Sequence, residues 1–85
     1  MSGLIKRSFS LAGHRTSVAL EAAFWDVLHE IARTRGMRLA ELVASVDAVR
    51  DGATPLASSL RVLALQDALG RDKNRAASTD VPSPR

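Results

Sequence analysis

The sequence predicts a mainly α-helical fold with a short antiparallel β-ribbon near the N-terminus and an additional C-terminal helix. The first observation is the strict alternation over residues 15–20, the period of a strand that buries one face. The second is a pair of amphipathic runs separated only by Gly36-Met37-Arg38, which predicts two helices joined at a sharp corner. The third is the length of 85 residues without cysteine, which favours one small domain, over residues 1–70.

The alternating segment at residues 15–20 has two different faces. The residues expected to face the helices are Thr16, Val18 and Leu20. The residues expected on the free face are Arg15, Ser17 and Ala19. Because a single strand leaves its backbone groups without a ladder, we expect a second copy of the chain to supply a partner strand.

Residues 6–11 alternate as well, and Ala12-Gly13 is suited to turn them back onto residues 15–20 as a hairpin. The alternative is an ordered arm without a ladder.

Three segments have the signals of helices. Residues 22–35 carry apolar side chains at helical spacing, beginning at Phe24, and Gly36 is suited to the left-handed position that ends a helix. Residues 39–50 form the second amphipathic run, and Thr54-Pro55 predicts the start of a third helix over 55–69. The residues predicted to form the core of a dimer are Thr16, Val18, Leu20, Phe24, Leu28, Ile31, Leu39, Leu42, Val43 and Val46.

Two features near these helices allow more than one interpretation. Trp25 lies at the edge of the apolar stripe of the first helix, where packing is a commoner role than ligand binding. The helix at 55–69 is apolar over much of its circumference, so it either caps its own subunit or joins subunits. Residues 71–85 have little to bury and contain two prolines, and we expect them to be disordered.

Composition and charge narrow the class of function. Residues 1–20 hold Lys6, Arg7 and Arg15 and no acidic residue, a bias that suits a partner with phosphates, although a basic terminus is also common on solvated surfaces. His14 and His29 lie near no other ligand at metal-binding spacing, and no nucleophile has a base beside it. We therefore expect no enzyme activity, no metal and no cofactor. No apolar window approaches membrane-spanning length, and we expect a cytoplasmic protein.

The order of elements, with a basic strand, a helix, a tight glycine corner and a second helix, resembles the ribbon-helix-helix family of bacterial DNA-binding proteins, the MetJ/Arc type. The wording Lys-Arg-Ser-x-Ser-x-Ala-Gly-His-Arg-Thr-Ser-Val-x-Leu-Glu-x-x-Phe-Trp, followed by Gly-Met-Arg-Leu-x-x-Leu-Val and Ser-Ser-Leu-Arg-Val-x-x-Leu, resembles a subgroup of short proteobacterial members. The resemblance implies an intertwined homodimer whose paired strands enter the DNA major groove.

On this resemblance, the free face of the ribbon reads bases. Arg15 is suited to guanine, Ser17 to either a donor or an acceptor, and Ala19 to a thymine methyl group. Ala19 departs from the family pattern of long or polar readers, so either specificity is low or the adjoining segment contributes. The residues expected to contact phosphates are Lys6, Arg7, His14 and Arg38.

Arg38 is expected at the N-terminus of the second helix, where a cation is unfavourable unless an anion lies opposite. The alternatives are that it points into solvent or pairs with Glu41 or with Asp72 of a neighbouring chain.

The sequence thus predicts a homodimeric, sequence-specific DNA-binding regulator, a repressor that occupies operator DNA. One rival is an antitoxin whose tail folds onto a toxin, although the tail offers Val81 as its main apolar anchor. A second rival is an oligomerisation or adaptor module that does not bind DNA and uses residues 56–69, the same surface that would join dimers into a tetramer. An outer strand at residues 6–11 would also either obstruct the groove or widen the sheet for protein contacts.

Overall fold

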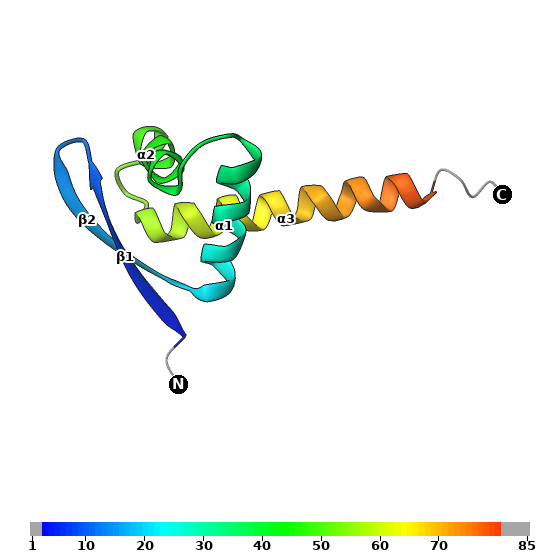
Figure 1. Cartoon of the computed structure of the whole chain (residues 1–85), viewed down its shortest axis with the longest axis horizontal. Coiled ribbons are helices and arrows are strands. Elements are labelled where there is room, and N and C mark those ends of the chain that lie inside the picture. Colours follow the sequence, from blue (N-terminus) through cyan, green and yellow to red (C-terminus); the bar gives the residue numbers. More distant parts are fainter. Residues whose placement is uncertain (1–2, 81–85) are drawn as a thin grey trace.

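The computed structural model describes the chain over residues 3–80, and its side chains over residues 3–71. The elements are β1 (Leu4–Leu11), β2 (His14–Glu21), α1 (Ala22–Thr34), α2 (Leu39–Val49) and α3 (Leu56–Asp80). The hairpin lies along one side of the helices, and the C-terminal half of α3 projects away from the body (Figure 1). The prediction of a mainly helical chain with an N-terminal antiparallel ribbon is confirmed.

The ribbon is a hairpin within one chain. β1 and β2 pair antiparallel from Leu4 opposite Glu21 to Leu11 opposite His14. Ala12 and Gly13 form the turn with φ of 51° and 85°, and two successive positive φ values are the signature of the type I′ turn that matches strand twist. The expectation that residues 15–20 need a second copy for a ladder is corrected here, because β1 already supplies one.

The hydrophobic core closes within a single chain. Every element contributes to it, and the buried residues are Phe9, Leu11, Val18, Leu20, Trp25, Leu28, Ile31, Ala32, Leu42, Val43, Leu56, Leu60 and Ala64. Among the residues predicted for a dimer core, the half-buried ones are Thr16, Phe24, Leu39 and Val46. α3 therefore covers, from the same chain, strand and helix faces that we had expected a partner to cover.

Trp25 joins α1 to β1. Its side chain is only 1% exposed, and its Nε1 donates a hydrogen bond of 2.8 Å to the carbonyl oxygen of Ile5. Its ring centroid lies 6.0 Å from that of Phe9. The inward face of α1 is thus centred on Trp25, while Phe24, from which we had begun the apolar stripe, is half-buried at its edge.

The corner between α1 and α2 follows the predicted glycine stop. Gly36 has φ of 68°, its N–H donates to Arg33, and the Met37 N–H donates to Ala32 at 2.9 Å. These two bonds form a Schellman motif, which satisfies the last carbonyl groups of α1. α2 then starts at Leu39, close to the expected boundary.

α3 is longer than expected. We predicted that the helix would end at residue 69 and that residues 71–85 would be disordered, but α3 continues to Asp80; residues 81–85 lie outside the described residues. The prediction equated a lack of burial with disorder, whereas residues 70–80 contain no proline and include several good helix formers. A helix nucleated by core packing can extend into solvent, and Arg71 pairs with Asp67 one turn earlier at 2.9 Å. No helix among the described residues is long and apolar enough to span a membrane.

The turn yields a stability prediction. Ala12 holds a left-handed conformation that costs an L-residue about 1–2 kcal/mol, and Asn tolerates this conformation better. Ala12→Asn should raise the free energy of unfolding by roughly 0.5–1 kcal/mol, measured by urea denaturation. Gly13→Ala should lower it, although the new Cβ would meet no atom within 4 Å, because the cost lies in the backbone alone. Ala53→Asn, in an exposed loop, is the control; an Ala12 variant no more stable than the wild type would contradict the turn assignment.

Candidate nucleic-acid interface

One face of the hairpin points away from the helices and carries polar side chains from both strands. We call it the outer face; its residues are Lys6, Ser8, Ser10, Arg15, Ser17 and Ala19. The register sets them in three cross-strand pairs: Lys6 with Ala19, Ser8 with Ser17, and Ser10 with Arg15. The outer face therefore brings the predicted base-reading residues together with Lys6 and with two serines that the sequence analysis did not single out.

Hydrogen bonds across the strands organise this face. Arg15 Nη1 donates to Ser10 Oγ at 3.1 Å, and the hydroxyl groups of Ser8 and Ser17 lie 3.2 Å apart. These six residues carry two positive charges, three hydroxyl groups and no carboxylate; the carboxylate of Glu21, in the next pair along the strands, is paired with Arg61. Such a set of donors is suited to anions and to hydrogen-bonding base edges. The signal for Ser8 and Ser10 was the alternation of residues 6–11, which also predicted their shared face.

Arg7 and His14 do not belong to the outer face. The Arg7 guanidinium lies 5.4 Å from the ring centroid of Trp25, a cation–π contact on the side of the hairpin that faces α1. His14 pairs with Leu11 beside the turn and is exposed at the end of the hairpin. The structure thus separates these two predicted phosphate contacts from Lys6.

Arg38 precedes α2 as its N-cap and is exposed. Its backbone N–H donates to the carboxylate of Glu41, the third residue of α2, at 2.7 Å, which is the bond that a Glu at this position makes in a capping box. The Arg38 guanidinium has no ion pair within the described part of the chain, which leaves its charge available. The Glu41 carboxylate at the same helix start competes with any incoming anion.

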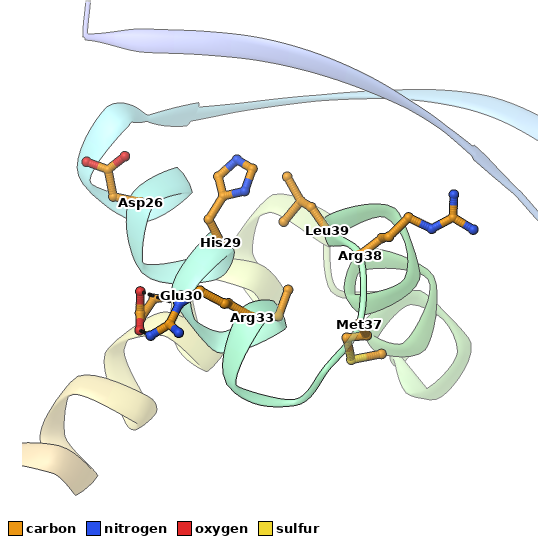
Figure 2. A pocket seen from close by; sticks show the side chains of 8 residues that line it. Asp26, His29, Glu30, Arg33, Met37, Arg38 and Leu39 are labelled. Atoms are coloured by element: carbon orange, nitrogen blue, oxygen red, sulfur yellow. Dashed lines mark hydrogen bonds and ion pairs between the residues drawn. The ribbon is translucent and has the colours of Figure 1, made fainter.

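An open pocket of about 550 Å³ lies between α1 and the start of α2. Its lining residues are Asp26, His29, Glu30, Ala32, Arg33, Met37, Arg38 and Leu39. Figure 2 shows Glu30 and Arg33, both on α1, joined to each other at one side of the pocket, while Arg38 extends toward the opposite side. The hydrogen bond from Arg33 lowers the pKa of Glu30, and the same contact raises the pKa of Arg33. The charges of this pair are mutually satisfied.

A further ion pair ties the ribbon to α3. Arg61 Nη2 lies 3.1 Å from Glu21 Oε1 at the junction of β2 and α1, and the guanidinium stacks 5.7 Å from the ring centroid of Phe24. Hydrogen bonds from the Glu21 backbone N–H and from Arg61 lower the pKa of Glu21. The sequence analysis missed this contact because the two residues lie 40 positions apart and no local pattern relates them.

The architecture is a two-stranded antiparallel β-ribbon packed on three helices, with a polar outer face. The chain belongs to the ribbon-helix-helix domain family, which matches residues 4–68. The resemblance stated from the sequence is confirmed.

One solved structure is similar in both fold and sequence. It is an uncharacterized protein from Bordetella pertussis Tohama I, with a TM-score of 0.75 and 35% identity. The match covers 95% of this chain and 64% of that chain, so this chain spans less than two thirds of its length. No match was found among curated proteins. Members of the ribbon-helix-helix family generally dimerise and bind DNA, and they are typically not enzymes.

The Glu21–Arg61 pair yields a pH prediction. A carboxyl group with a lowered pKa stabilises the fold above its ordinary pKa of about 4.3, and this contribution is lost as the pH falls through the lowered value. Glu21→Gln should therefore unfold at a slightly lower temperature than the wild type at pH 7. The difference should shrink as the pH falls below about 4. Asp26→Asn, an exposed change on α1, is the control; a deficit of the Gln variant that persists at pH 2 would contradict an ionic role for Glu21.

Proposed function

We propose that this protein is a sequence-specific DNA-binding regulator that acts as a homodimer and represses transcription by occupying operator DNA. The observation that carries the proposal is the outer face of the hairpin, where Lys6 and Arg15 accompany three serine hydroxyl groups without a carboxylate. A face of this chemistry is attracted to the phosphate backbone and offers donors to base edges.

The free edge of β2 supports the homodimer. Within the described residues the sheet has two strands, and only one edge of β2 is paired with β1. In an antiparallel ladder alternate residues bond to each neighbour, so the other edge of β2 presents a row of backbone donors and acceptors. Antiparallel pairing of two β2 edges satisfies both rows and gives a sheet in the order β1, β2, β2, β1. The half-buried residues Thr16, Phe24, Leu39 and Val46 are then available for packing between the two chains.

In this dimer the central strands contribute the base readers. Arg15 makes the bidentate contact with guanine O6 and N7, Ser17 bonds to either type of base-edge group, and Ala19 contacts a thymine methyl group. The contact of Arg15 with Ser10 limits the conformations of a long side chain, which lowers the entropy lost on binding.

Phosphate contacts position the sheet. Lys6 contributes from the outer face, while exposed His14 and Arg38 contribute from the hairpin end and from the start of α2. We assign Arg7 a stabilising role on Trp25 in place of the phosphate contact expected from the sequence. For a phosphate to bind the Arg38 N–H, the hydrogen bond between this N–H and Glu41 must first break; otherwise the phosphate binds the next N–H groups of α2.

A second candidate, an oligomerisation module, is favoured by an apolar groove of about 350 Å³ between α2 and α3. Val49 is 85% exposed there, and Val62 is about half exposed. Exposed apolar surface of this kind commonly marks a protein contact. A tetramer in sedimentation equilibrium that shows no salt-dependent retention on DNA would favour this candidate over the first.

The base-reading role predicts a change in specificity. Arg15→Ala should reduce the binding free energy for the preferred duplex, selected from a random pool, by about 1–3 kcal/mol. The loss of binding free energy for an unrelated duplex should be much smaller. Lys6→Ala should instead weaken binding to both duplexes equally. It should also reduce the slope of log affinity against log salt concentration by about 0.9 for each protomer contact that is lost. Fluorescence anisotropy at several salt concentrations measures both effects.

The matched control is Thr34→Ala, an exposed hydroxyl change at the end of α1 that should leave DNA affinity unaltered. Equal losses on both duplexes after Arg15→Ala would contradict base reading. Failure of the wild type to bind any duplex at low salt would contradict the proposed function as a whole.

A further inference from the structure

The proposed dimer has a four-stranded sheet, and this sheet is wider than the major groove that its central strands would enter. Neighbouring strands lie about 4.8 Å apart, so the outermost strands of four are separated by roughly 14 Å. The major groove of B-DNA is about 12 Å wide. Two central β2 strands fit between the groove walls, but the two β1 strands do not. Each β1 must therefore lie over a wall, where the phosphates are.

The side chains that β1 presents on the outer face match that position. After Leu4 at the start of the strand they are Lys6, Ser8 and Ser10, and the two serines lie opposite Ser17 and Arg15. A serine hydroxyl is one bond from Cβ, so it lets the strand backbone approach a phosphate closely. Long side chains at positions 8 and 10, opposite Ser17 and Arg15, would hold these base readers away from the bases, whereas Lys6 lies opposite Ala19 and has a flexible stem.

The hydrogen bonds already present leave donors available. Ser10 Oγ accepts from Arg15, which leaves its own hydroxyl hydrogen free to donate. Ser8 and Ser17 share one hydrogen bond between their hydroxyl groups, so the accepting member of this pair also keeps a free hydrogen. When Ser17 donates to Ser8, the free donor lies on the outer strand.

We propose that Ser8 and Ser10 on β1 bind DNA phosphates at the groove walls, adding two contacts from this strand to the one assigned to Lys6. Ser10 has a second task, because it holds the base-reading Arg15 while it donates to the phosphate. This inference rests on the proposed DNA-binding function. It gives a DNA-binding role to the outer strand, which the sequence analysis expected either to obstruct the groove or to widen the sheet for protein contacts.

The test uses the full chain with both serines changed, Ser8→Ala with Ser10→Ala, on the preferred duplex and on an unrelated duplex of equal length. Two lost bonds to charged phosphates should weaken binding to both duplexes by roughly tenfold or more. The salt slope should stay at the wild-type value, because no counterion-displacing charge is removed. Ser8→Thr with Ser10→Thr keeps both hydroxyl groups in residues that favour strands and should retain most of the affinity.

The outcomes separate this inference from the function on which it rests. Wild-type affinity in the alanine variant would overturn the phosphate role of β1 while leaving DNA binding intact. A loss confined to the preferred duplex would also overturn it, because the serines would then read bases. A wild type that binds neither duplex would refute the proposed function itself. Phosphate-ethylation interference with the wild type is a measurement that needs no variant. If ethylation of the phosphates along the walls of the occupied groove does not interfere with binding, the inference is equally overturned.

Discussion

The backbone ladder between β1 and β2 is the constraint on which the rest of this structure depends. The positive φ values of Ala12 and Gly13 close the hairpin without a longer loop and thereby fix the register. Because side chains alternate along each strand, that register places Phe9 and Val18 against the helices and leaves Ser10 and Arg15 on the outer face. A slip by one residue would bury the polar set and expose the core. The same ladder leaves one edge of β2 for a second chain.

Because α3 belongs to the same chain as the core it covers, a second chain does not have to supply that cover. Leu56, Leu60 and Ala64 complete the core of a single chain, so dimerisation is not required to bury Val18 or Leu20. Arg61 also ties α3 to Glu21 at the point where the ribbon enters α1. The proposed dimer therefore forms by joining preformed sheets at their edges, with a smaller shared core than full interlocking of helices would give.

Sequence reading predicted the features that local patterns determine. The glycine corner at Gly36, the strand period and the helix starts depend on neighbouring residues, and the structure has them close to the expected positions. The sequence analysis did not predict contacts between distant segments. These are the hydrogen bond from Trp25 to Ile5, the cation–π contact of Arg7 with the Trp25 ring, and the ion pair of Arg61 with Glu21. The helical extension beyond Gly70 was missed because it depends on continuation from a packed helix, which local burial does not reveal. Ser10 gained its place in the candidate site only when pairing set it opposite Arg15.

The most direct test of the central claim is a map of backbone amide chemical-shift changes when the full chain is titrated with its preferred duplex. We expect the largest changes on the outer face, at Ser8, Ser10, Arg15 and Ser17, with smaller changes at the start of α2. Changes concentrated instead on the α2–α3 groove around Val49 and Val62, with an unperturbed hairpin, would contradict the claim.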